Sequence, residues 1–144
     1  MTMASDIRRA RIEDAADCAR VVDTWITRTA WMPRALSLAQ LTTLISDAYP
    51  KREIWVAGDP IDCFMSVDPA EAKVGALYCL RTGQGIGKAL LDIAKAGRDW
   101  LWLTVYVPNR HAERFYRREG FVEVARLAPE PPDMLTMIKM EWCR

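Results

Sequence analysis

The sequence lacks the features by which several classes of protein are recognised. It has one histidine, and its four cysteines lie far apart with no C-x-x-C pair, so no metal site is expected. No apolar run approaches the ~18 residues that span a membrane, and the first residues do not resemble a signal peptide. Its 20 basic and 19 acidic residues leave a net charge of +1, without a basic stripe for nucleic acid. Neither a membrane nor a nucleic acid is therefore an expected partner.

The composition is that of an ordinary globular chain. Hydrophobic residues make up 51% of the 144 residues and charged residues 27%. A chain of this length buries ~70% of its unfolded surface, which suffices for a core without disulfides. We find no internal repeat and no low-complexity tract. The expectation is a single domain over residues 1–144, in the reducing cytoplasm, with free and buried thiols.

The hydrophobic periodicity predicts alternating helices and strands. One helix begins at Asp14, and a second begins at Ser37, where Ser37 and Gln40 form a capping box. Two further helices follow the glycine-rich segment and the Pro108-Asn109 pair. Strands are predicted at residues 7–12, 53–57, 62–67, 73–80, 101–107, 121–127 and 135–142. The predicted fold class is α/β (an α+β mixed sheet covered by helices), in the order β-α-α-β-β-β-α-β-α-β-β.

A glycine-rich turn between a strand and a helix is the first candidate site. The strand at 73–80 leads into Gly83-Gln84-Gly85-Ile86-Gly87, and free N–H groups at such a helix start attract phosphates. A P-loop requires Ser or Thr where this chain has Ala89. A dinucleotide fingerprint requires a third glycine where this chain has Lys88 or Leu90. Both of these phosphate sites are excluded, which leaves another anion site or a tight connection.

Two linked motifs resemble those of the acyl-CoA N-acyltransferase (GNAT) superfamily. Residues 83–91 read GQGIGKALL, like the diphosphate loop and following helix of that family. Residues 109–121 read NRHAERFYRREGF, like its second signature. The two motifs occur in the family's order, separated by a strand, and the predicted element order agrees with that fold over nearly the full chain. One departure is Thr82, where the family usually has Gln or Arg.

The resemblance implies an N-acetyltransferase that uses acetyl-CoA as cosubstrate and no metal. Main-chain N–H groups of the glycine-rich turn would hold the diphosphate, and the pantetheine arm would run beside strand 73–80. A main-chain N–H near Cys79 or Leu80, at the end of that strand, would polarise the thioester carbonyl. The residues thereby assigned to the cofactor are Cys79, Leu80, Gln84, Gly85, Ile86, Gly87, Lys88 and Asn109.

Tyr116 is the residue that the resemblance assigns to catalysis. A phenol with a pKa near ~10 can protonate the leaving thiolate of CoA. The alternative is that Tyr116, like its neighbour Phe115, is a core residue. Asn109 has an equal alternative as a helix N-cap. The single histidine, His111, is expected to be an exposed helical residue without a catalytic role.

The acceptor is expected to be a primary amine of a small molecule or a protein, which attacks directly in a ternary complex. Trp25, Trp31 and Met32 are the candidate walls of its pocket, with a core or homodimer-interface role as the alternative. Arg117, Arg118 and Lys88 are candidates for the 3′-phosphate of CoA or, more commonly, parts of a solvated face. No general base can be identified from the sequence, and water can also carry the proton. The alternative function is a non-catalytic module that binds or senses CoA.

Overall fold

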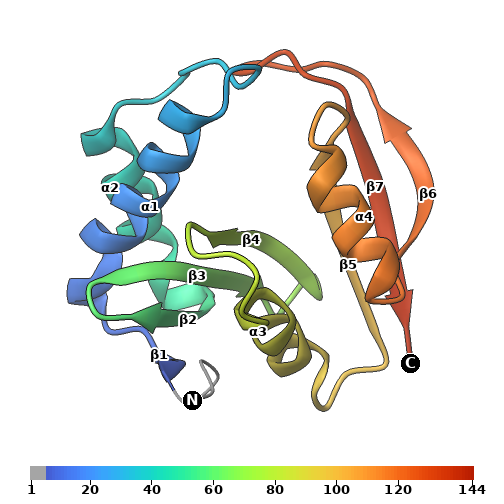
Figure 1. Cartoon of the computed structure of the whole chain (residues 1–144), viewed down its shortest axis with the longest axis horizontal. Coiled ribbons are helices and arrows are strands. Elements are labelled where there is room, and N and C mark those ends of the chain that lie inside the picture. Colours follow the sequence, from blue (N-terminus) through green and yellow to red (C-terminus); the bar gives the residue numbers. More distant parts are fainter. Residues whose placement is uncertain (1–5) are drawn as a thin grey trace.

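The computed structural model describes residues 6–144 and shows helices on both faces of one mixed sheet (Figure 1). The strands are β1 (Arg8–Arg9), β2 (Glu53–Gly58), β3 (Ile61–Asp68), β4 (Lys73–Cys79), β5 (Trp100–Tyr106), β6 (Val122–Leu127) and β7 (Met137–Cys143). The helices are α1 (Ala15–Arg28), α2 (Leu38–Ala48), α3 (Ile86–Lys95) and α4 (Arg110–Arg118), with 3-10 turns η2 (Ile12–Asp14) and η3 (Tyr49–Lys51). The predicted fold class and element order are confirmed.

The first strand differs most from its prediction. A strand is predicted at residues 7–12, whereas β1 covers only Arg8–Arg9 and the chain then enters η2. Asp14 explains the early turn, since its carboxylate accepts hydrogen bonds from the Arg11 N–H at 2.8 Å and from Arg8 Nη1 at 2.8 Å. The Arg8 guanidinium, by this hydrogen bond, holds the pKa of Asp14 below its usual value. An alternating pattern read as one strand is therefore half strand and half capped turn.

The sheet has one weak seam, between β4 and β5. Its strand order is β1-β2-β3-β4-β5-β7-β6, and every neighbouring pair is antiparallel except β4 and β5. These two run parallel and are paired only at Lys73 and Trp102. Beyond that point they diverge, so that the half with β1–β4 and the half with β5–β7 open like a V (Figure 1).

The two faces of the sheet carry separate cores. Helices α1 and α2 pack on one face, where Val21 and Leu41 join a buried cluster with Phe64. Helices α3 and α4 pack on the other, where Leu90 and Tyr116 belong to a larger buried cluster. Because side chains alternate along a strand, consecutive residues of β4 reach opposite faces of the sheet.

The cysteines are free thiols, as expected, but not all are buried. Cys18 and Cys63 are buried, Cys79 is half-buried and Cys143 is exposed at the end of β7. The expectation of burial is therefore wrong for Cys143. In residues 6–144 no helix combines the length and apolarity needed to cross a membrane.

A stability difference tests the packing of α3 against the sheet. Leu90 of α3 is fully buried at 0% exposure, whereas Leu44 of α2 is 55% exposed. Leu90→Ala is expected to lower the free energy of unfolding by about 2–5 kcal/mol, because it removes a core side chain and leaves a cavity. The matched surface change Leu44→Ala should alter it by less than ~0.5 kcal/mol. Urea denaturation measures both, and equal effects would contradict the described packing.

Candidate active site

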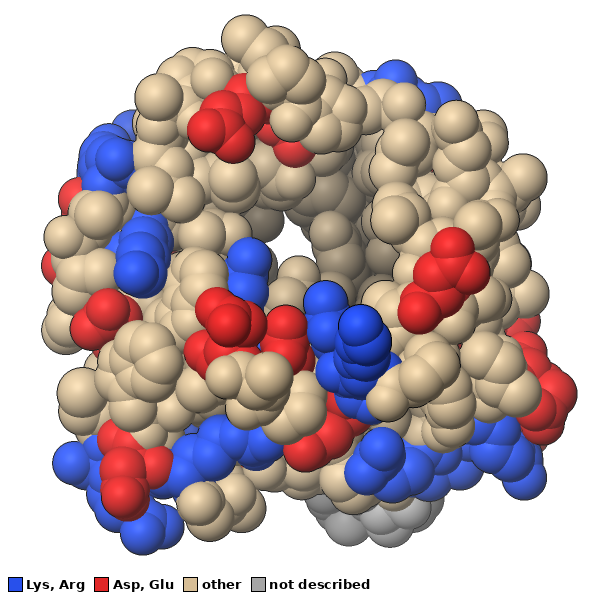
Figure 2. Space-filling view, turned by 180° about the vertical axis from the view of Figure 1, so that it is seen from behind, with Lys and Arg blue, Asp and Glu red and all other residues tan. Residues whose placement is uncertain are grey.

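A cavity of about 700 Å³ occupies the opening between β4 and β5. Its walls come from α1, β4, the glycine-rich turn, β5 and α4. Seen from behind, an opening passes between the half that carries α1 and α2 and the half that carries β6 and β7 (Figure 2). A ligand on the α3 side of the sheet can therefore meet one that arrives from the α1 side.

The glycine-rich turn forms one end of this cavity. Gly83 and Gly85 have φ of +78° and +76°, the left-handed region that favours glycine, and Gly85 is the N-cap of α3. A Cβ placed on either would find no atom within 4 Å, so no side chain plugs the turn. The first hydrogen bond inside α3 runs from the Ala89 N–H to the Gly85 carbonyl. The N–H groups before Ala89 have no acceptor within the helix and can bind an anion.

The edge of β4 offers free main-chain groups to the cavity. The Leu80 N–H donates to the Asp62 carbonyl at 2.9 Å, so Leu80 is one of the positions whose main-chain groups bond to β3. In an antiparallel pair the bonded positions alternate, so the N–H and C=O of Leu77 and Cys79 point away from β3. They point toward β5, which has already diverged. A ligand can therefore pair with β4 as an added strand.

Because bonded positions alternate along β4, the main-chain N–H groups of Cys79 and Leu80, predicted together to polarise the carbonyl, point in opposite directions. The Leu80 N–H is committed to β3, and Leu80 is not among the cavity-lining residues. The Cys79 N–H is on the free side and Cys79 lines the cavity. Of the two, Cys79 is the position from which a main-chain donor faces the opening.

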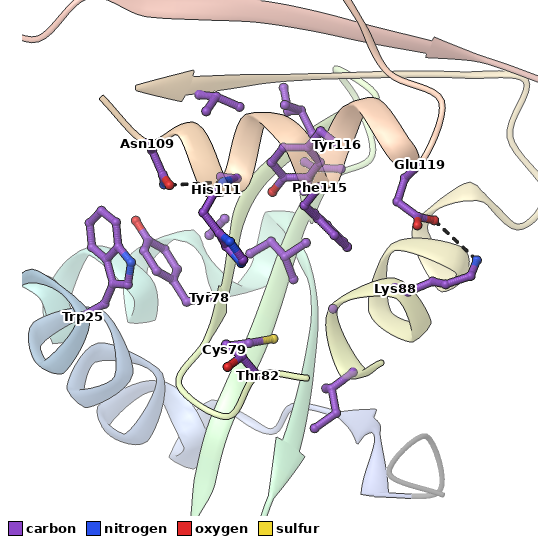
Figure 3. A pocket seen from close by; sticks show the side chains of 18 of the residues that line it. Trp25, Tyr78, Cys79, Thr82, Lys88, Asn109, His111, Phe115, Tyr116 and Glu119 are labelled. Carbon is purple, nitrogen blue, oxygen red and sulfur yellow. Dashed lines mark hydrogen bonds and ion pairs between the residues drawn. The ribbon is translucent and has the colours of Figure 1, made fainter. Parts of the chain in front are cut away.

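Tyr116 reaches the cavity from α4. Its ring is buried at 8% exposure between Phe115 and Phe121, with centroids 5.1 and 5.6 Å away. Its hydroxyl makes no hydrogen bond with residues 6–144, yet no fully buried side-chain oxygen or nitrogen there lacks a partner. The hydroxyl is therefore accessible, and it points into the cavity on the side of β4 (Figure 3). Burial raises the pKa of Tyr116, which keeps the phenol protonated.

Most of the other residues predicted to bind the cofactor line the cavity, but some of them already have partners within the chain. Asn109 lines the cavity and also caps α4, because its Oδ1 accepts from the Ala112 N–H at 3.2 Å. Lys88 lines the cavity, but its Nζ is held by Asp92 at 3.2 Å and Glu119 at 3.4 Å. The other residues predicted to bind the cofactor and found lining the cavity are Gly85, Ile86 and Gly87. Gln84 does not line it, and its Oε1 accepts from Arg81.

Of the residues predicted to wall the acceptor pocket, one lines the cavity and two do not. Trp25 lines the cavity from α1. Trp31 and Met32 do not; the Trp31 ring packs edge-on against Trp25 at 5.7 Å and Tyr106 at 5.9 Å. Trp31 thus bridges the two halves of the molecule beside the cavity.

The cavity is also lined by residues that were not predicted to belong to the site, among them His111, Tyr78 and Tyr106. His111 projects from α4 into the space between α4 and β4, and Tyr78 lies beside Trp25 (Figure 3). Arg118, which was predicted as a candidate for the 3′-phosphate, also lines the cavity and has no ion pair with the described residues. The motif position of His111 was the available signal for it. Tyr78 and Tyr106 lie near the ends of β4 and β5 where the strands have diverged, so both line the opening.

Comparison with known proteins shows which family has this sequence pattern and fold. A model of the acetyltransferase (GNAT) domain matches residues 50–123. Among solved structures, a ribosomal-protein-alanine N-acetyltransferase from Brucella melitensis aligns with a TM-score of 0.73 and 17% identity, over 96% of this chain and 99% of that one. Two others are YjaB from Escherichia coli (TM-score 0.69, 23% identity, 94% and 95%) and yncA from Salmonella typhimurium, solved with its cofactor acetyl-CoA (0.69, 17%, 95% and 92%). No curated protein sequence matches this chain.

The matched residues 50–123 make up half of the chain and include both motifs, the open edge of β4 and Tyr116. The structural neighbours extend the same fold over nearly all of the remainder. The chain belongs to the GNAT acetyltransferase family.

Proposed function

We propose that this protein transfers the acetyl group of acetyl-CoA to a primary amine in a ternary complex. Acetyl transfer from acetyl-CoA is the activity of the family, and the amine acceptor is the step beyond it. The observation that carries the proposal is the Tyr116 hydroxyl. It is a protonated phenol, without a hydrogen-bond partner in the described chain, that faces the free main-chain edge of β4 across the cavity.

The chain's own groups can bind and orient acetyl-CoA. The N–H groups at the start of α3 suit its diphosphate, and glycines at positions 83 and 85 leave room for close approach. Main-chain groups of Leu77 and Cys79 suit the amides of the pantetheine arm. Arg118, which lines the cavity, supplies a positive charge for a phosphate.

Transfer then needs two contributions besides orientation. The amine lone pair attacks the carbonyl carbon, and the Cys79 N–H stabilises the negative charge that develops on the carbonyl oxygen. The carbon–sulfur bond breaks as the intermediate collapses, and Tyr116 donates its proton to the departing thiolate. The attacking nitrogen gives its proton to water. Holding both reactants in line supplies up to ~7–11 kcal/mol of the barrier reduction.

A pair of glycine variants tests the diphosphate site. Gly85 and Gly97 have φ of +76° and +75°, and a Cβ on either would find no atom within 4 Å. Alanine at either position should therefore cost a similar ~1–2 kcal/mol of stability through backbone strain. Only Gly85→Ala places a methyl group beside the turn, so it should weaken CoA binding about tenfold or more. Calorimetric titration with CoA measures this, and equal affinity of both variants would refute the assigned site.

Tyr116→Phe tests the catalytic assignment. It removes the proton donor while keeping the ring, so kcat should fall by about 10²-fold or more with the affinity for CoA nearly unchanged. Tyr49→Phe is a matched control, because the Tyr49 hydroxyl bonds to the Ala10 carbonyl at 2.9 Å and Tyr49 does not line the cavity. That control should cost about 1 kcal/mol of stability and leave kcat unchanged. Unchanged turnover in Tyr116→Phe would show that another group protonates the thiolate.

The pH dependence of the intact enzyme is a second readout. Burial raises the pKa of Tyr116 above its ordinary value, so the acid remains protonated throughout the neutral and mildly alkaline range. The wild-type kcat should therefore not decline between about pH 7 and about pH 9, even as the amine loses its proton. A fall of kcat over this range would contradict a protonated Tyr116 as the acid.

A further inference from the structure

The cavity has an aromatic end on the face of the sheet that α1 and α2 cover. Trp25 from α1, Tyr78 from β4 and Tyr106 from β5 all line it. The rings of Trp25 and Tyr78 lie 5.3 Å apart, and Trp31 connects Trp25 to Tyr106 with centroid distances of 5.7 and 5.9 Å. The sequence contributes these rings from three separate elements. We call Trp25, Tyr78 and Tyr106 the aromatic wall.

A carboxylate stands behind this wall. Asp133, from the connection between β6 and β7, accepts a hydrogen bond from the Tyr106 hydroxyl at 2.9 Å and another from the Leu135 N–H at 3.1 Å. It is half-buried and forms no ion pair with residues 6–144. Its charge also reaches Tyr78, whose pKa is raised to about 12, first by burial and then by Asp133. The aromatic wall thus has a negative charge that no cation of the described chain neutralises.

The cation–π contacts of residues 6–144 use rings outside the aromatic wall. Lys73 and Lys139 each lie 4.7 Å from the centroid of Trp102, at the closed end of the opening where β4 and β5 still pair. None of the cation–π contacts in residues 6–144 involves the three rings of the aromatic wall. Electron-rich ring faces near a carboxylate that is in no ion pair attract an ammonium group.

The ammonium group held there is not the amine that reacts. A protonated nitrogen has no lone pair for attack, so the reacting amine must be neutral beside the Tyr116 hydroxyl. Both positions line the same cavity, and Tyr78 lies beside Trp25 on the side that faces His111 and Tyr116 (Figure 3). An acceptor that fills both positions therefore carries two nitrogen groups joined by a short apolar chain.

We propose, on the basis of the proposed function, that the acceptor is a diamine: one neutral amine is acetylated while the aromatic wall holds a second, cationic nitrogen. Asp133 does not line the cavity itself, and it acts through its negative charge behind Tyr106. The apolar linker lies along the ring faces. An acceptor with a carboxylate at its far end is disfavoured, because that carboxylate would face Asp133 and the electron-rich rings. A monoamine reacts but lacks the second anchor.

Three probes of equal chain length separate these cases: 1,4-diaminobutane, n-butylamine and 4-aminobutanoate. Their far ends are cationic, neutral and anionic. With the intact protein and acetyl-CoA, release of CoA thiol should give a kcat/KM for the diamine at least about tenfold above that for butylamine, with aminobutanoate lowest. Equal values for the three, with thiol released, would overturn the diamine proposal while leaving amine acetylation in place.

Two aspartate variants test the anchor itself. Asp133→Asn removes the charge and should reduce the preference for the diamine over butylamine by about tenfold. Asp99→Asn removes the same charge from a side chain that is 89% exposed and outside the cavity, and should leave the preference unchanged. A preference that survives Asp133→Asn in full would refute the role of Asp133.

A binding measurement tests the proposed cationic site even if no acetyl transfer is detected. Calorimetric titration of 1,4-diaminobutane into the protein saturated with CoA should show binding that Asp133→Asn weakens and Asp99→Asn does not. If all three amines fail to release thiol but the diamine binds in this way, amine acetylation fails and the cationic site stands. No binding of the diamine would overturn the cationic site.

Discussion

The fold depends on the divergence of two parallel strands that share a single pairing position. If β4 and β5 remained paired along their length, the free main-chain groups of Leu77 and Cys79 would be occupied by β5. Their divergence leaves polar groups unpaired at the centre of a sheet, which is costly unless something else bonds to them. In the proposed complex, acetyl-CoA pairs with β4 and would satisfy these groups, so the cost in stability and the proposed binding site have the same origin.

The helices on both faces of the sheet hold its two halves together although β4 and β5 diverge. The larger cluster, which contains Leu90 and Tyr116, fixes α3 and α4 to opposite halves of the sheet, and Trp31 joins the halves again beside the cavity. Tyr116 is rigidly packed against Phe115 and Phe121, so its hydroxyl is held in place while the rest of the ring is shielded. A buried and unionised phenol next to an open edge is what a proton donor to a leaving thiolate requires.

Local sequence signals were sufficient for the element order but not for everything in the site. The glycine-rich turn and the capping box of α2 are local patterns, and both have the predicted conformation. Strand ends are set by hydrogen bonds to distant residues, which is why the first strand proved shorter and why Leu80 proved to be committed to Asp62. The aromatic wall and Asp133 lie on four segments that only the tertiary fold brings together. No spacing rule could have paired Tyr106 with a carboxylate 27 residues later.

The central claim is that acetyl-CoA binds along the free edge of β4. Amide hydrogen exchange followed by NMR, with and without saturating acetyl-CoA, tests it residue by residue. The amides of Leu77 and Cys79 should become protected on binding, whereas the Leu80 amide, already bonded to Asp62, should change little. Unchanged exchange at Leu77 and Cys79 in the saturated complex would contradict the account.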